Sequence, residues 1–142
     1  MKKYIVIGNP INHSFSPKLH NYWIKQNKIY ATYDKRKLSN SELDELILDV
    51  KKENINGVNV TVPFKNKIIP YLDELSDEAK KTQSVNTIHL ENKKVIGYNT
   101  DIEGFEKAIK KINFSFKNKK IFILGSGGVV PSIIYASMKM RS

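Results

Sequence analysis

The chain has 142 residues and a hydrophobic content of 40%, which is enough to form the core of one ordinary domain. It contains no cysteine, so disulfide bonds, zinc–thiolate sites and thiol catalysis are excluded. Basic residues outnumber acidic ones by 24 to 14, but only Arg36 and Arg141 are arginines and the lysines are scattered, so a solvated lysine-rich surface is favoured over a nucleic-acid-binding face.

The N-terminal residues 4–7 are expected to form a strand. Their short apolar run before Gly8 is too brief for the core of a signal peptide. No apolar stretch approaches the ~18 residues that are needed to cross a bilayer. We therefore expect a cytoplasmic protein without a membrane partner or a nucleic-acid partner.

Strand and helix patterns alternate along the chain, which is typical of an α/β fold with a largely parallel sheet. Strands are expected at residues 4–7, 30–36, 58–62, 85–90, 93–98 and 119–124. Helices are expected after Ser16 as N-cap with Pro17 in the first turn, at 43–50 behind a capping box at 39–42, at 67–72, 77–81 and 102–112, and after the glycines at 125–128. The first helix should carry Leu19, Tyr22 and Trp23 on one face.

A polar, lysine-rich run at residues 113–120 marks a domain boundary. The one strand and one helix that follow cannot bury both sides of a parallel strand by themselves. We therefore expect that part of the second unit is missing from this sequence.

Asn59 and Thr61 share the polar face of a strand whose other face carries valines. Pro63 lacks an N–H donor and ends this strand, which leaves Lys65 at its carboxyl end, where ligands gather in open α/β sheets. Taken alone, an edge strand followed by a solvated lysine is the commoner explanation.

Ser14 and Ser16 flank an aromatic residue directly before a helix N-terminus. Such a terminus attracts anions, so the paired hydroxyl groups could bind a carboxylate. The alternative is that Ser16 only caps the helix while Ser14 is solvated.

Asn86 and Asp101 follow at two further strand ends. Asn86 can donate and accept hydrogen bonds, which suits a substrate hydroxyl, and Asp101 could pair with Lys65 and hold its ammonium group in place. The alternative for Asp101 is an acidic first turn behind a Thr100 N-cap.

A glycine turn at residues 125–128 opens the last expected helix, the setting in which backbone N–H groups cradle a dinucleotide pyrophosphate. Val130 stands where the general pattern has its third glycine, so the turn alone is a weak signal.

Together, the motifs at residues 13–17, 59–65, 85–87, 97–101 and 125–128 resemble the shikimate dehydrogenase family, with the quinate/shikimate enzymes close to it. The substrate-binding residues that the resemblance implies are Ser14, Ser16, Thr61, Lys65, Asn86 and Asp101. The implied catalytic residues are Lys65, as acid/base, and Asp101. The implied NADP-binding residues are Asp77, Gly125, Ser126, Gly127, Gly128 and Val129. No metal is implied.

By this resemblance residues 1–101 form a substrate domain, and residues 102–142 form a connecting helix and the first βα unit of a Rossmann domain. The implied reaction is the reversible NADPH-dependent reduction of 3-dehydroshikimate to shikimate, in aromatic amino-acid (chorismate) biosynthesis. Residues 82–84 depart from the smaller apolar residues that the family usually has there.

The family's chains continue well beyond this sequence, so we expect an incomplete fragment with little or no dehydrogenase activity. A non-catalytic shikimate-binding remnant and a quinate/shikimate dehydrogenase are the alternatives. The choice of NADP over NAD and the formation of a homo-oligomer through the truncated domain stay open.

Overall fold

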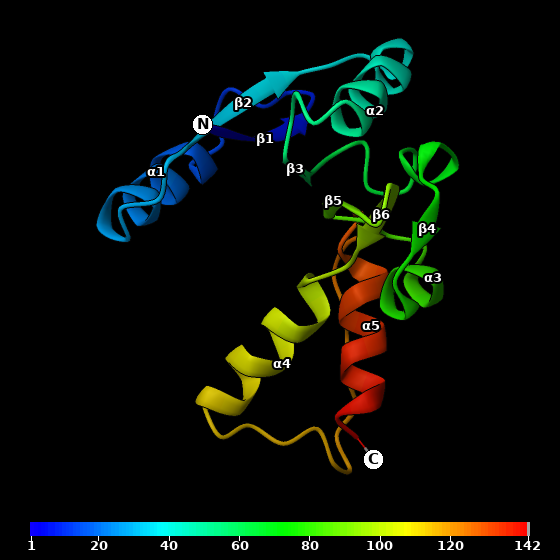
Figure 1. Cartoon of the computed structure of the whole chain (residues 1–142). Helices are drawn as coiled ribbons and strands as arrows, with labels where there is room; N and C mark the ends of the chain where they lie inside the picture. The colour runs from blue at the N-terminus through cyan, green and yellow to red at the C-terminus, as the bar shows by residue number, and fades with distance from the viewer. Residues whose placement is uncertain (142) are drawn as a thin grey trace.

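In residues 1–141, which the computed structural model describes, six strands form one sheet in the spatial order β2-β1-β3-β5-β6-β4 (Figure 1). The strands are β1 (Lys2–Gly8), β2 (Ala31–Lys37), β3 (Gly57–Val60), β4 (Glu74–Leu75), β5 (Thr87–Glu91) and β6 (Lys94–Tyr98). β1 pairs in parallel with β2 and β3, and β4 with β6, whereas β5 is antiparallel to both of its neighbours. The expected α/β class with a mostly parallel sheet is confirmed.

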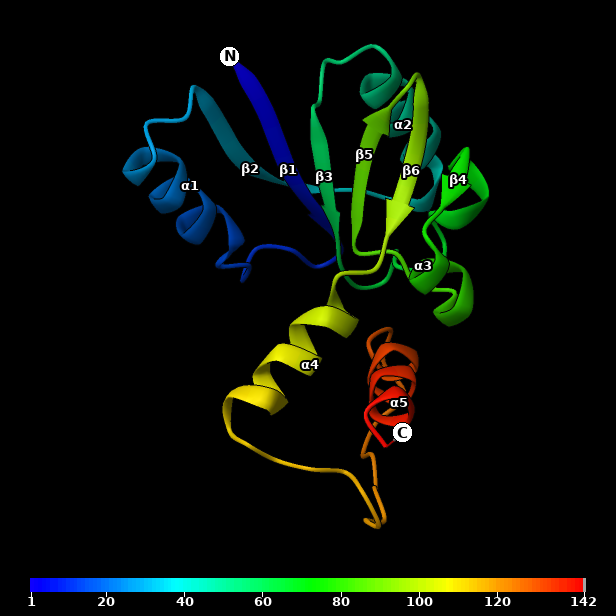
Figure 2. The same cartoon turned by 60° about the horizontal axis from the view of Figure 1, so that its bottom comes forward.

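Five helices and two short 3-10 turns lie between and after the strands in residues 1–141. They are α1 (Ser16–Gln26), α2 (Leu43–Lys51), α3 (Asp77–Thr82), α4 (Asp101–Lys111) and α5 (Val130–Lys139), with short 3-10 turns η1 (Asn40–Glu42) and η2 (Ile69–Tyr71). Figure 2 shows α4 and α5 lying together beyond the edge of the sheet at which β1, β3 and β6 end. No helix within residues 1–141 has the length and apolar character to cross a membrane.

Each face of the sheet has its own hydrophobic cluster, because side chains alternate along a strand. Ile5 and Ile7 of β1 belong to the main cluster, which also contains the buried face of α2. Val6 points to the opposite face and packs with Tyr33 and with Ile24 of α1. The core therefore sits on both sides of β1, which fixes the carboxyl end of this strand.

Helix α1 does not begin or pack as expected. Ser16 is its first helical residue rather than its N-cap, because the residue before it, Phe15, occupies the N-cap position without a capping side chain. The Ser14 hydroxyl oxygen instead accepts the Ser16 N–H at 3.3 Å, which satisfies one N–H of the first turn. The expected apolar face, Leu19, Tyr22 and Trp23, is about half exposed, and no residue of α1 is buried.

The expected strand at residues 119–124 is wrong. Residues 121–126 are not part of any strand, and the side chains of Phe122 and Leu124 are each 87% exposed. An extended segment becomes a strand only when a neighbour satisfies its backbone groups, and the described chain offers this one no partner. The following helix, α5, forms as expected.

The other departures are small. The expected strand end at residue 62 lies at Val60, and the short strand β4 has no counterpart in the sequence pattern. The hairpin of β5 and β6 and the capping box of Ser39 and Glu42 are both present.

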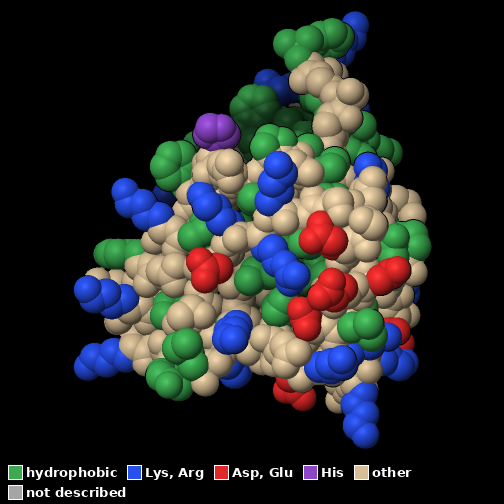
Figure 3. All heavy atoms as spheres, turned by 90° about the horizontal axis from the view of Figure 1, so that it is seen from above, with side chains coloured by type: hydrophobic (Ala, Val, Ile, Leu, Met, Phe, Trp, Pro, Cys, Tyr) green, Lys and Arg blue, Asp and Glu red, His purple; other side chains and the backbone are tan. Residues whose placement is uncertain are grey.

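The charges on the face shown in Figure 3 are mixed. Lysine and arginine side chains alternate there with aspartate and glutamate and do not merge into one basic patch. This is the pattern of an ordinary solvated surface.

We predict that Leu46→Ala lowers the free energy of unfolding by about 2 to 5 kcal/mol, the range for truncating a buried leucine. Leu46 is fully buried in the main cluster. Leu48→Ala on the same helix is the matched control, because Leu48 is 52% exposed and its truncation should change the free energy by less than about 0.5 kcal/mol. Urea unfolding of both variants measures this, and equal losses would contradict the packing described for α2.

Candidate active site

The loop after β3 brings Lys65 to the carboxyl edge of the sheet. The Thr61 N–H donates to the Ile7 carbonyl at 3.0 Å, which ties the start of the loop to β1. Phe64 is 1% exposed and anchors the loop in the core, and the Lys65 carbonyl accepts the Val85 N–H at 2.7 Å. Lys65 is therefore held by packing on one side and by the neighbouring loop on the other.

Lys65 forms an ion pair with the first residue of α4. Its Nζ donates to Asp101 Oδ2 at 2.6 Å, and the two side chains are only 14% and 25% exposed. Such partly buried charges need further hydrogen bonds to offset the loss of water. The pairing expected from the sequence is present.

Asn86 supplies that further hydrogen bond. Its Nδ2 donates to Asp101 Oδ1 at 2.8 Å and to Thr100 Oγ1 at 3.0 Å, while its Oδ1 accepts the Thr100 N–H at 3.0 Å. Each oxygen of the Asp101 carboxylate thus has its own donor, and the carboxylate cannot turn without breaking one of these bonds.

Three residues outside the expected binding set, Tyr33, Asn59 and Thr87, continue this hydrogen-bond network. The Tyr33 hydroxyl donates to Asn59 Oδ1 at 2.7 Å, and Asn59 Nδ2 donates to Thr87 Oγ1 at 3.2 Å. Thr87 Oγ1 in turn donates to Asn86 Oδ1 at 3.1 Å. The polar face of β3 had identified Asn59, but only the pairing of three strands brings Tyr33 to it.

Burial raises the pKa of Tyr33 to about 12, and a hydrogen bond with the Ser16 side chain lowers it by less. The Tyr33 side chain is 4% exposed, so the charged phenolate would be poorly solvated there. The neutral hydroxyl therefore stays available as a donor to Asn59.

Ser14, Ser16 and Thr61 lie at the same edge of the sheet. The loop after β1 carries Ser14 and leads into Ser16, the first residue of α1. The Asn9 N–H of this loop donates to the Val62 carbonyl at 3.0 Å, which joins it to the loop that carries Lys65. All three hydroxyl-bearing residues are half-buried.

Gly8 lets these two loops come together. A Cβ at this position would lie 2.8 Å from Thr61 Cγ2 and 3.1 Å from the Val62 carbonyl oxygen. Both distances are shorter than ordinary van der Waals contacts. The end of β1 can therefore lie this close to Thr61 only because residue 8 has no side chain.

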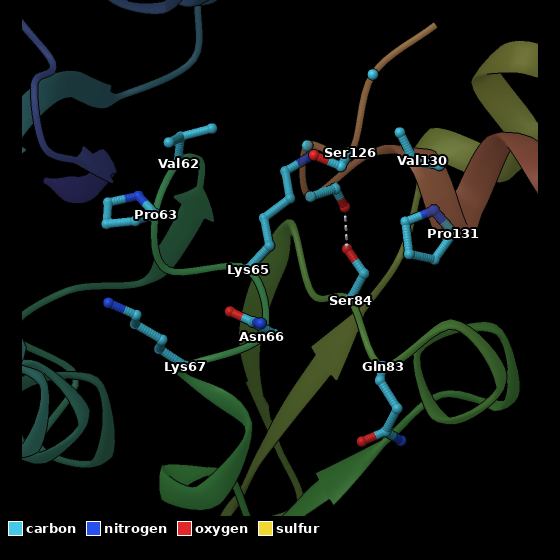
Figure 4. Close-up of a pocket in the computed structure, with 13 residues that line it drawn as sticks. Val62, Pro63, Lys65, Asn66, Lys67, Gln83, Ser84, Ser126, Val130 and Pro131 are labelled. Atoms are coloured by element: carbon cyan, nitrogen blue, oxygen red, sulfur yellow. Dashed lines mark hydrogen bonds between the residues drawn. The ribbon is translucent and has the colours of Figure 1, made fainter. Parts of the chain in front are cut away.

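The glycine turn closes the other side of the site. A cavity of about 600 Å³ lies between Lys65 and the turn, and Figure 4 shows Lys65 pointing toward the turn. Of the expected cofactor-binding residues, those that line it are Gly125, Ser126, Gly127 and Gly128. Val129 and Asp77 do not line it, and Asp77 is the first residue of α3.

The backbone of the turn suits an anion. Gly125 has a φ of 127°, which L side chains rarely adopt, and the turn leads directly into the N-terminus of α5. Within residues 1–141, no group of three or more His, Asp or Glu side chains gathers as metal ligands would.

Comparison with known proteins gives a consistent result. Residues 6–88 match the family model described as the shikimate dehydrogenase substrate binding domain. The shikimate dehydrogenase (NADP(+)) of Pelagibacter ubique is 59% identical over 140 residues, which are 99% of this chain and 53% of that protein. The enzyme of the same name from Aquifex aeolicus is 43% identical over 136 residues, 96% of this chain and 51% of that protein.

Solved structures agree in fold. The crystal structure of shikimate dehydrogenase from Aquifex aeolicus superposes with a TM-score of 0.91 at 41% identity, covering 99% of this chain and 53% of that one. The shikimate complex of the Thermus thermophilus enzyme gives 0.89 at 29% identity, covering 98% and 53%. The chain spans about half the length of the curated relatives it matches.

We predict that Tyr33→Phe removes a pH dependence of stability. The phenol titrates near pH 10 when unfolded and near 12 when folded, so between these values the unfolded state holds fewer protons and the free energy of unfolding falls as pH rises. The stabilisation from the neutral Tyr33 phenol is fully present below pH 10. Above it, the free energy of unfolding falls by at most about 1.4 kcal/mol per pH unit.

Urea unfolding between pH 8.5 and 11 measures this difference. Tyr30→Phe is the matched control, because Tyr30 is 78% exposed. Above pH 10, the free energy of unfolding of the native chain and of Tyr30→Phe should fall with pH by the same amount. That of Tyr33→Phe should fall less. Parallel curves for all three proteins would contradict a buried Tyr33 donor.

Proposed function

Because the chain belongs to the family of shikimate dehydrogenase substrate-binding domains, we propose that it forms a pocket for shikimate and 3-dehydroshikimate with Lys65 and Asp101 as the catalytic pair. The observation that carries the proposal is the 2.6 Å contact between Lys65 Nζ and Asp101 Oδ2 at the carboxyl edge of the sheet. Ligands gather at this edge in open α/β sheets.

The hydroxyl and amide groups around the pair suit a small hydroxylated acid. Ser14 and Ser16 bind the substrate carboxylate beside the N-terminus of α1, where the helix dipole favours negative charge. Thr61 and Asn86 bind ring hydroxyls, and each can both donate and accept.

Lys65 acts as the acid/base. Its Nζ donates a proton to the oxygen of the substrate carbonyl as negative charge develops on it, and takes the proton back in the reverse direction. Asp101 keeps the ammonium aimed at that oxygen and balances its charge. A cation placed before the reaction stabilises the developing alkoxide without reorganisation.

The glycine turn suits NADP. Gly125 to Gly128 line the cavity beside Lys65 and lead into a helix N-terminus, the arrangement that binds a pyrophosphate. When bound, NADPH supplies the hydride for the carbonyl carbon. In this proposal residues 1–101 are the substrate domain, and residues 102–142 are the connecting helix and the start of the dinucleotide-binding domain.

A second candidate is a shikimate-binding chain without turnover. It is favoured by the segment before the glycine turn, because residues 121–124 lack the strand pairing that would form part of a nucleotide-binding sheet. For the 142-residue chain by itself we therefore expect binding of shikimate with little or no NADPH oxidation.

We predict that shikimate binds to the purified 142-residue chain in a calorimetric titration. Benzoate, which has the carboxylate but no ring hydroxyls, should bind at least about tenfold more weakly, since each lost hydrogen bond is worth about 1 kcal/mol. Equal binding of both acids, or of neither, would contradict a shikimate pocket. Robust NADPH-dependent turnover by this chain would contradict the second candidate.

We predict that Lys65→Ala, placed in a full-length enzyme that contains this sequence, lowers kcat by about 10²- to 10⁴-fold, the usual contribution of a positioned acid/base. Shikimate affinity should change much less. Lys67→Ala is the matched control, because Lys67 lies on the same loop and is exposed. Equal large losses in kcat and in affinity would assign Lys65 to binding alone.

A further inference from the structure

The glycine turn is tied to the substrate domain by a buried side chain. Ser84 lies in the loop between α3 and β5 and is 2% exposed. Its Oγ donates to the Gly128 carbonyl at 2.9 Å, the bond that is dashed in Figure 4. A buried hydroxyl group that loses its partner is costly, so this contact resists opening.

A second buried contact holds the helix that follows the turn. Asn99 Nδ2 donates to Thr82 Oγ1 at 2.9 Å and to Ser132 Oγ at 2.8 Å. The three side chains are 6%, 5% and 0% exposed, and Ser132 belongs to the first turn of α5. The C-terminal end of the glycine turn is thus held at two points, at Gly128 and at Ser132.

These contacts place the turn close to the stem of Lys65, with room for about one methyl group between them. A Cβ at Gly128 would lie 3.6 Å from both Cβ and Cδ of Lys65, which is van der Waals distance. In addition, a trans peptide points its N–H opposite to its carbonyl, so the bond from Ser84 directs the Val129 N–H away from Ser84. One hydroxyl group therefore sets both the distance of the turn from Lys65 and the direction of a backbone donor.

We propose that Ser84 and Ser132 are positioning residues that hold the glycine turn closed over Lys65 before any ligand binds. Ser84 acts on the turn directly, and Ser132 acts through Asn99. The inference rests on the proposed function only for the role of Lys65; the closure itself follows from the buried contacts.

The exposure of the Lys65 amine to a reagent tests this closure. Reductive methylation with formaldehyde and a borohydride, followed by peptide mass spectrometry, gives the rates at Lys65 and at exposed Lys67 in the same 142-residue protein. In Ser84→Ala and in Ser132→Ala the ratio of the Lys65 rate to the Lys67 rate should rise by about fivefold, the factor for loss of one net hydrogen bond.

Tyr135→Phe is the control on the same helix. It removes the exposed contact from Lys81 Nζ to the Tyr135 hydroxyl at 3.2 Å and should leave the ratio unchanged. An unchanged ratio in both serine variants would overturn the proposal, as would an equal rise in Tyr135→Phe or a parallel rise at Lys67, which would indicate general loosening.

Titration of the same samples with shikimate separates the two conclusions. If the native chain fails to bind shikimate while the ratio rises in the serine variants, the proposed function fails and the closure stands. If shikimate binds and the ratio does not change, the closure fails and the proposed function stands.

Discussion

The partly buried ion pair between Lys65 and Asp101 is the interaction on which the rest of the site depends. Two charges that lose water in this way are stable only when neighbouring groups complete their hydrogen bonding. Asn86 does so for Asp101. Asn86 is in turn held by a chain of hydrogen bonds that runs through Thr87 and Asn59 to Tyr33. The partly buried Lys65–Asp101 pair thus depends on residues of three strands, β2, β3 and β5.

The topology of the sheet satisfies that demand. β1 and β3 are parallel neighbours, so the loops that carry Ser14 and Lys65 leave from the same edge. The antiparallel hairpin of β5 and β6 then returns the chain to that edge, where Asp101 begins α4. Residues that are far apart in the sequence meet because every one of them lies at this edge of the sheet.

Much of this arrangement could be predicted from local patterns, and the exceptions share one physical cause. Lys65 and Asp101 were recognisable because each follows a strand, and the capping box of Ser39 was recognisable because it is local. Tyr33 was missed because its partner, Asn59, is two strands away in the sheet. The strand at residues 119–124 was expected wrongly because its apolar pattern is local, whereas strand formation requires a neighbour. Thr82 and Ser84 looked like a packing departure, but the folded chain shows that Ser84 donates to the Gly128 carbonyl and that Thr82 accepts from Asn99, which also donates to Ser132 of α5.

The geometry of the pocket also depends on an atom that is absent. Gly8 carries no charge and no polar side chain. Even so, a single methyl group at this position would lie so close to Thr61 and the Val62 carbonyl that the surrounding atoms would have to move. A substitution of Gly8 by alanine would therefore change the shape of the site, although it alters neither charge nor polarity. In this fold, how well a position tolerates substitution depends on how closely neighbouring segments of the chain pass it, even where the residue carries no functional group.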